Sequence, residues 1–322
     1  MDEYGFELRL CTHLEAEREA IVARQLGGGV HTTGRVLDIL LVEPGPGFDD
    51  RARLTDATIP DALLTGELGP GSFTDWRRAL GAGMGARRAV DRGERIGFLE
   101  REHRGGREVV RPVDRYPEDW FGRVVAIENK PDLASPGDLY GQLQFDVSLG
   151  LVDAVVLATA SHVTRAHRHR LPDEVGIWRF DPEAGEVDVV QAPEALAVDR
   201  AGVERRGRHP GWTDVAVVDA AAKADARRRL AERAYGKGWR TRSLPACANV
   251  DARHDAAPGA PWCRFKGRLV DPTAECGPAC SGHAPAAPPA VDLTAVRDAR
   301  QPWRRDPPDR RRRQSTLQGF ED

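Results

Sequence analysis

The residues whose types and spacing most clearly suggest chemistry are Glu128 and Lys130, which follow a short apolar run. That run, Val124 to Ile127, is typical of a buried strand. Side chains two apart in a strand share one face, so an acid and an amine leave this strand together. The chain has four lysines against 43 arginines, and only lysine combines a compact charge with a proton that it can lose. We therefore take this pair as the centre of a candidate site.

The segments that follow this pair predict a compact α/β unit. Pro131 ends the strand, because proline cannot donate to the ladder. Residues 136–138 give a helix start, and Leu139 to Leu149 has the length of about three turns. Asp153 to Thr159 predicts a second buried strand. No glycine-rich turn separates the first strand from its helix, so a phosphate-binding loop is excluded.

Two upstream segments carry further acids. Phe6 to Leu26 predicts an amphipathic helix, with Glu15 and Glu17 near the border of its apolar face. Either glutamate alone has a solvated surface position as its alternative. Arg35 to Val42 predicts a buried strand that contains Asp38. A buried aspartate is costly unless it is paired, hydrogen-bonded or bound to a metal, and capping at a strand end is the alternative.

A helix with Glu17 or Glu15, a strand with Asp38 and a strand with Glu128 and Lys130 resemble, in that order, the PD-(D/E)XK nuclease superfamily. This superfamily includes archaeal Holliday-junction resolvases. The resemblance implies an α/β fold whose mixed sheet is flanked by helices. Gln142 is placed like the glutamine of many exonuclease members.

The implied activity is hydrolysis of DNA phosphodiester bonds in repair or recombination. Asp38 and Glu128 would hold Mg²⁺ or Mn²⁺, and Lys130 would orient the attacking water or stabilise the pentavalent phosphate. The alternative is a non-catalytic DNA-binding or clamp-binding adaptor that retains the nuclease fold. Asp38 and Glu128 are 90 residues apart, where the superfamily usually has a short hairpin, so we expect an inserted domain over 46–118.

The expected insertion resembles a winged helix-turn-helix. Helices are predicted at 59–65, 73–80 and 86–96, followed by a hairpin at 98–113 whose turn holds Gly105 and Gly106. In that arrangement the hairpin tip and the third helix would contact DNA. The arginines concerned are Arg104 and Arg107 on the hairpin and Arg87, Arg88 and Arg92 on the helix. A charged, solvated face on a packing module is the alternative.

The nuclease-like core is expected to comprise 1–45 and 119–219, followed by a basic helix over 220–245 and a cysteine-rich region over 246–283. Four cysteines of this region could hold a structural Zn²⁺, namely Cys247, Cys263, Cys276 and Cys280. One alternative, known from some members of the superfamily, is an iron–sulfur cluster that includes Cys11. Unligated reduced thiols are another.

Residues 284–322 are rich in proline, aspartate and arginine, and we expect them to be disordered. Their end, with Gln314, Leu317 and Phe320, resembles the peptide that binds the sliding clamp PCNA, although Glu321 stands in place of the second aromatic residue. Such a peptide would present two apolar side chains to a pocket of the clamp.

Net charge and hydropathy limit the partners and cellular locations that we expect. The net charge of -3 over 322 residues gives no global field for nucleic acid, although local basic runs could supply one. No 18-residue apolar run or charged leader is present, which predicts a cytoplasmic protein with no membrane partner. A homodimer is left open. As a whole, the chain is similar to a haloarchaeal family that has no assigned activity.

Overall fold

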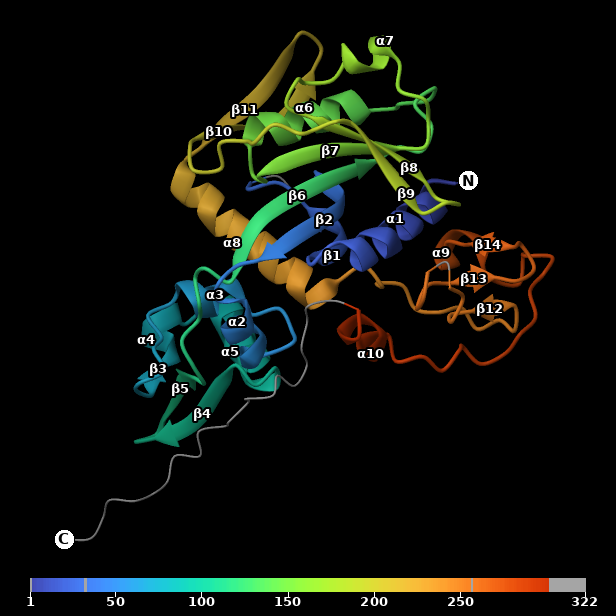
Figure 1. The fold of residues 1–322 in the computed structure, drawn as a ribbon. Coiled ribbons are helices and arrows are strands. Elements are labelled where there is room, and N and C mark those ends of the chain that lie inside the picture. The colour runs from blue at the N-terminus through green and yellow to red at the C-terminus, as the bar shows by residue number, and fades with distance from the viewer. Residues whose placement is uncertain (1, 32–33, 256, 301–322) are drawn as a thin grey trace.

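The computed structural model describes residues 2–31, 34–255 and 257–300. Its centre is a six-stranded mixed sheet with the strand order β1-β2-β6-β7-β8-β9 (Figure 1). The strands β6, β7 and β8 run parallel, whereas β1–β2, β2–β6 and β8–β9 are antiparallel pairs. The bounds are β1 Ile21–Gly27, β2 Val36–Pro44, β6 Phe121–Asn129, β7 Ala154–Thr159, β8 Gly176–Asp181 and β9 Glu186–Gln191.

Helices cover both faces of this sheet. On one face, α1 (Glu3–Glu17) packs Phe6 and Leu10 into a cluster with Ile39 and Val156 of the sheet. On the other face, α6 (Leu139–Leu149) and α8 (Ala220–Lys237) contribute to a second cluster, which contains Leu40 and Val155. Because neighbouring residues of one strand enter opposite clusters, the central strands are apolar throughout. The predicted α/β class, with helices flanking a mixed sheet, is confirmed.

The first predicted helix is too long. It ends at Glu17, and Ile21–Gly27 forms the edge strand β1. The register pairs Ile21 with Val42 and Leu26 with Leu37, so the hairpin satisfies the backbone of β2 along that edge. The apolar spacing of 21–26 suits a helix as well as a strand, and the β-branched Ile21 and Val22 favour the strand.

The segment between β2 and β6 forms its own small sheet, with the order β3-β5-β4 (Figure 1). It packs around Leu63, Trp76, Val90, Phe98 and Val110. Its elements are α2 Phe48–Leu54, α3 Asp61–Thr65, β3 Thr74–Asp75, α4 Trp76–Leu80, α5 Met84–Arg95, β4 Leu99–Arg104 and β5 Arg107–Pro112.

The β4–β5 turn contains the two glycines that the sequence placed there. Gly105 and Gly106 have φ angles of +56° and +75°. A two-residue hairpin turn needs this left-handed conformation at both central positions, and glycine adopts it at little cost.

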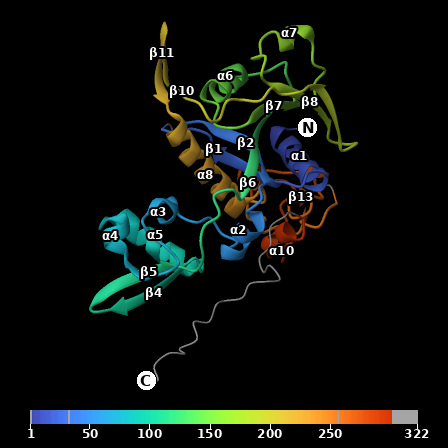
Figure 2. The ribbon, with the colours of Figure 1, turned by 60° about the vertical axis from the view of Figure 1, so that its left-hand side comes forward.

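Beyond β7 the chain adds a short helix, α7 (Arg165–Arg168), and a separate hairpin of β10 (Gly202–His209) and β11 (Trp212–Val218). The hairpin projects from the molecule beside α6 (Figure 2). Neither strand of this hairpin is among those predicted above. The strand β10 was missed because Arg205, Arg206, Arg208 and His209 hide any alternation of apolar residues.

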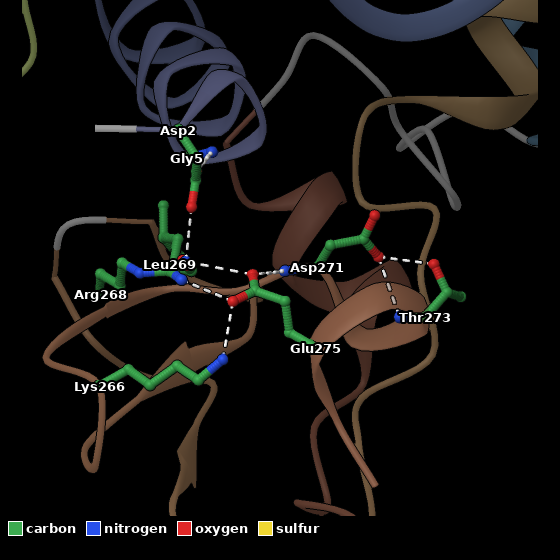
Figure 3. A network of polar contacts seen from close by, with 8 residues as sticks. All are labelled: Asp2, Gly5, Lys266, Arg268, Leu269, Asp271, Thr273 and Glu275. Carbon is green, nitrogen blue, oxygen red and sulfur yellow. Dashed lines mark hydrogen bonds and ion pairs between the residues drawn. The ribbon is translucent and has the colours of Figure 1, made fainter. Parts of the chain in front are cut away.

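The cysteine-rich region contains only very short elements, namely β12 Val250–Asp251, β13 Trp262–Cys263, β14 Arg268–Leu269 and α9 Pro272–Glu275. Charge contacts tie it to the start of α1 (Figure 3). The Glu275 carboxylate accepts from Arg268 Nη2 at 2.5 Å and Lys266 Nζ at 2.8 Å. Arg268 Nη1 also binds Asp2, the N-cap of α1, at 2.5 Å.

The expectation of disorder over 284–322 is wrong for its first part, because α10 (Leu293–Asp298) forms there, capped by the Asp292 side chain. The clamp-like peptide with Gln314, Leu317 and Phe320 lies outside the described residues. No helix within the described ranges has both the length and the apolar character needed to cross a membrane.

Candidate functional site

The structure brings Asp38 and Glu128 together across two neighbouring strands. Ile39 of β2 pairs with Ile127 of β6, which places the two acids side by side in the antiparallel ladder. Asp38 Oδ2 accepts a hydrogen bond from the backbone N–H of Asn129 at 3.0 Å. Glu128 is 7% exposed. The 46–118 segment therefore leaves this pairing intact and emerges from the far ends of the two strands.

The two carboxyl groups are both largely removed from water, and each disfavours ionisation of the other. Burial raises the pKa of Glu128 to about 8, and the charge of Asp38 adds to the effect. Burial likewise raises the pKa of Asp38 to about 6, with the Asn129 N–H opposing the shift and the charge of Glu7 increasing it. Adjacent carboxylates in such a place ionise together only when a cation compensates them. Carboxylate oxygens are the kind of donor that hard divalent cations prefer.

Lys130 follows Glu128 by two residues, and its amine contacts the first residue of α1, Glu3. Its Nζ is 3.1 Å from Glu3 Oε2, and its side chain is 23% exposed. The backbone N–H of Lys130 donates to Ala158 O at 2.9 Å, so hydrogen bonding to β7 continues one residue past the end of β6. The amine is therefore anchored and remains in reach of solvent.

The acid that α1 contributes is Glu7, together with Glu3, rather than Glu15 or Glu17. Glu7 is buried and accepts from Arg24 at 2.7 and 2.8 Å. The Gln25 amide connects Glu7 Oε1, at 3.2 Å, to Asp38 Oδ1, at 3.3 Å. Gln25 has a φ of +54°, an unusual value for a residue other than glycine, and this backbone conformation is part of the site.

The two glutamates expected from the sequence have other positions. Glu15 is buried against Arg240, at 2.7 and 2.5 Å, and against the Trp239 indole N–H, at 2.9 Å. Glu17 is exposed at the end of α1. Identifying Glu7 from the sequence would have required placing the end of α1 correctly at Glu17. With residues 21–27 forming a strand, it is the start of α1, where Glu7 lies, that reaches Asp38 through Gln25.

Arg35 and Asp146 also belong to the site, and sequence reasoning missed both. Arg35 Nη2 binds Glu128 Oε2 at 2.7 Å and Asp146 Oδ2 at 2.6 Å, and its Nε binds Asp146 Oδ1 at 2.9 Å. All three side chains are buried. The available signal was an acid on the inward face of α6. Gln142 is half-buried one turn before Asp146, on the same side of α6.

The four cysteines of the 246–283 region lie close enough for three of them to affect the pKa of Cys276. Cys247 and Cys263 are buried, whereas Cys276 and Cys280 are half-buried. Burial raises the pKa of Cys276, and the charges of Cys263, Cys247 and Cys280 raise it further. The Ala284 N–H donates to Cys247 Sγ at 3.5 Å.

Cys11 lies apart from these thiols, in the apolar core beneath α1. Burial raises its pKa, and Glu7, Arg24, Glu15 and Arg240 are the charges that most affect it. This position does not favour the iron–sulfur alternative. Across the described residues, no three His, Cys, Asp or Glu side chains are arranged so that they could already hold a metal ion.

The arginines predicted to contact DNA are exposed on the 46–118 segment. Arg87, Arg88 and Arg92 project from α5, and Arg107 begins β5 at the hairpin turn. Arg104 is exposed as well, but it pairs with Glu102 at 2.8 Å and covers the Phe73 ring at 4.2 Å. The segment therefore presents positive charge on both predicted elements.

These observations define a mixed-sheet α/β protein with a buried cluster of carboxylates at its central strands. Residues 21–285 match the model of a family of unknown function, DUF5787. The chain therefore belongs to that family. No curated protein and no solved structure matches it.

Proposed function

We propose that this protein is a Mg²⁺-dependent DNA nuclease of the PD-(D/E)XK kind. The observation that carries the proposal is the pairing of β2 with β6, which sets Asp38 beside Glu128, with Lys130 two residues further along the chain. The two carboxylates lie on paired strands with pKa values raised to about 6 and about 8. Lys130 comes directly after the last residue of β6, and its amine pairs with Glu3. Acids that repel each other beside an amine fit phosphodiester hydrolysis.

The order of elements supports the same conclusion. A helix (α1), a hairpin (β1–β2), a third antiparallel strand (β6), a helix (α6) and a parallel strand (β7) follow one another, interrupted only by the 46–118 segment. The resemblance to the superfamily implies the helix, the strand with Asp38, the strand with Glu128 and the position of Gln142 in this order, whereas β1 was not expected. The helix acid differs from the expected one, since Glu7 replaces Glu15 and Glu17.

The acids at this place offer two carboxylate groups to a hard divalent cation, and further ligands would have to come from water or substrate. Asp38 and Glu128 would hold it through carboxylate oxygens, and Arg35 fixes Glu128 through Oε2. When bound, such an ion polarises the scissile phosphodiester and lowers the pKa of the attacking water. Lys130 would donate to a phosphate oxygen as negative charge develops there. Glu3 keeps the amine in place, at 3.1 Å.

The 46–118 segment supplies the second element of the proposal, a winged helix that binds DNA. The strand order β3-β5-β4, with α4 and α5 between β3 and β4, supports this assignment. In a winged helix of this kind, α5 would be the recognition helix and the β4–β5 hairpin would be the wing.

The direct test is cleavage of labelled duplex, flap and junction DNA by the purified protein with Mg²⁺ or Mn²⁺. We expect Asp38→Ala, Glu128→Ala and Lys130→Ala each to lower the rate at least about 100-fold, which is the size of effect for one lost catalytic interaction. Glu17→Ala is the matched control, because it removes an exposed acid of α1 and should keep full activity. The proposal fails if no substrate is cut, or if Lys130→Ala cuts at the wild-type rate.

Arg35 favours one alternative, a DNA-binding adaptor without catalysis. Its guanidinium lies 2.7 Å from Glu128 and already compensates part of the negative charge that a metal would neutralise. An adaptor would bind DNA with a steep salt dependence, and binding would not depend on Lys130. The same panel distinguishes the two functions, because an adaptor binds every substrate and cuts none.

A further inference from the structure

A groove of about 420 Å³ lies on the opposite side of the core from the 46–118 segment. Its walls carry Gln144 and Ser148 of α6, His169 and Arg170 after α7, and Arg205 of β10. Figures 1 and 2 both show α6 beside the β10–β11 hairpin, with α7 at the same end of the molecule. Arg205 Nη1 donates to Gln144 Oε1 at 3.2 Å, which joins two of the walls. We call this feature the α7–β10 groove.

Among the described residues, the arginines around this groove form no ion pair with an acid. Residues 162–170 contain three arginines, three histidines and no acid. Five arginines lie on α7, on the chain after it and on β10, and within the described part of the chain none has a carboxylate oxygen within 4.0 Å; they are Arg165, Arg168, Arg170, Arg205 and Arg206.

Some exposed arginines elsewhere do have such partners, whereas those of the 46–118 segment at Arg87, Arg88, Arg92 and Arg107 have no ion pair among the described residues. Arg53 pairs with Asp50 at 2.6 Å, and Arg179 pairs with Asp188 at 3.0 Å. A concentration of unpaired guanidinium groups produces a local positive field, and such a field attracts a polyanion.

The basic segment begins next to the chain that leaves the acidic site. Ser161 Oγ accepts from the Leu133 N–H at 3.1 Å and donates to Pro131 O at 3.2 Å. Pro131 directly follows Lys130. A strand whose phosphodiester lay at Lys130 would therefore find α7 at the neighbouring strand end and the groove beyond it.

The tip of the β10–β11 hairpin adds an aromatic surface. His209 and Trp212 stack with ring centroids 5.0 Å apart and planes 21° apart. Asp214 holds His209 Nε2 at 2.8 Å, and Trp212 is 62% exposed. An exposed ring beside basic side chains is a stacking platform for an unpaired base.

We propose that the α7–β10 groove is a second polynucleotide-binding surface, separate from the 46–118 segment, and that it binds the sugar-phosphate backbone of a strand leading away from the acidic site. The last clause rests on the proposed nuclease function, whereas the binding itself does not. Arginine is suited to this contact because its planar guanidinium forms paired hydrogen bonds with phosphate oxygens.

The test compares two triple variants of the full chain, without divalent cation, by fluorescence anisotropy of a labelled oligothymidine strand and a labelled duplex. The groove variant is R168A/R170A/R205A. The matched control R53A/R179A/R264A also removes three exposed arginines, but each of these has a carboxylate partner. Circular dichroism verifies that both variants are folded.

Three lost phosphate contacts should reduce the slope of log K against log salt concentration by about 2 to 3, and should weaken binding roughly 100-fold near 0.1 M salt. The control should change affinity several-fold at most. A larger loss on the oligothymidine, increased further by Trp212→Ala, identifies a single strand as the ligand. A loss on the duplex that Trp212→Ala does not increase identifies a duplex.

The groove proposal is overturned if both triple variants bind like the wild type, if both lose affinity equally, or if the wild type binds neither probe. Mg²⁺-dependent cleavage together with unchanged binding by the groove variant overturns the groove and leaves the nuclease standing. Groove-dependent binding by a protein that never cleaves supports the groove and overturns the nuclease.

Discussion

The ion pair between Arg51 and Glu232 offers the sharpest test of how the 46–118 segment is held on the core. Arg51 of α2 has no exposed surface, and Glu232 of α8 is 2% exposed. Their atoms meet at 2.5 and 2.7 Å. The same carboxylate accepts from Tyr116 Oη at 3.0 Å and from the Ile59 N–H at 3.1 Å. One carboxylate thus joins α8 to three places in or next to the segment.

Replacing Glu232 by Gln leaves the buried Arg51 charge uncompensated. Burial by itself would lower the pKa of Arg51, but the charge of Glu232 and its hydrogen bonds, with smaller contributions from Tyr235 and Tyr116, together raise the pKa above its ordinary value. Removing one partner of such a pair costs about 3–5 kcal/mol of unfolding free energy. Unfolding entropy is about 2.1 cal/mol/K per residue, so for a chain of this length Tm should fall by about 5 °C.

The assay is urea denaturation of the wild type, E232Q and the double variant R51M/E232L. We expect the double variant to recover most of the loss, because an apolar pair of similar volume leaves no buried charge. R53A is the matched control. It removes the exposed Arg53–Asp50 pair and should cost less than about 0.5 kcal/mol. A loss below about 1 kcal/mol for E232Q, or a double variant no more stable than the single one, would refute this reasoning.

Three further predictions concern protons and metals. Because the folded-state pKa values of Asp38 and Glu128 are raised to about 6 and about 8, metal-free stability should decline as pH rises from about 5 to 8. The Tm increase produced by Mg²⁺ should grow over the same window and be absent in D38N/E128Q; a pH-independent increase would contradict this. If the four late cysteines bind zinc, metal analysis should find about one zinc per chain, and a chelator should lower Tm, whereas C276S/C280S should contain none. Hydrogen bonds from Arg268, followed by those from Lys266, lower the pKa of Glu275 to about 2. The stability that Glu275 contributes is therefore complete above about pH 4.5 and lost towards pH 2, and the stability difference between wild type and E275Q should shrink in that range. A difference that stays constant from pH 5 to pH 2 would show that this carboxylate contributes no pH-linked stability.

The central strands and the α6 helix could be predicted from local sequence. The α6 bounds match the predicted Leu139 to Leu149, and β7 begins one residue after its predicted start and ends at its predicted end. These elements are apolar enough, or punctuated clearly enough by proline and glycine, that no distant contact was needed to identify them. Local sequence also marked Asp38 and Glu128 as the conspicuous acids of two buried strands, whereas their proximity was expected only from the resemblance to the nuclease superfamily.

Only the tertiary structure decided which other charges join them. Residues 21–27 become a strand because β2 offers an edge to pair with, and this contact shortens α1 and brings Glu7, rather than Glu15, to the site. Arg35 and Asp146 are 111 residues apart in the chain and meet only when α6 packs on the sheet. Local periodicity specifies which face of an element is buried. The partner of a buried charge depends on how elements far apart in the chain pack together, and that information is not present in any one segment.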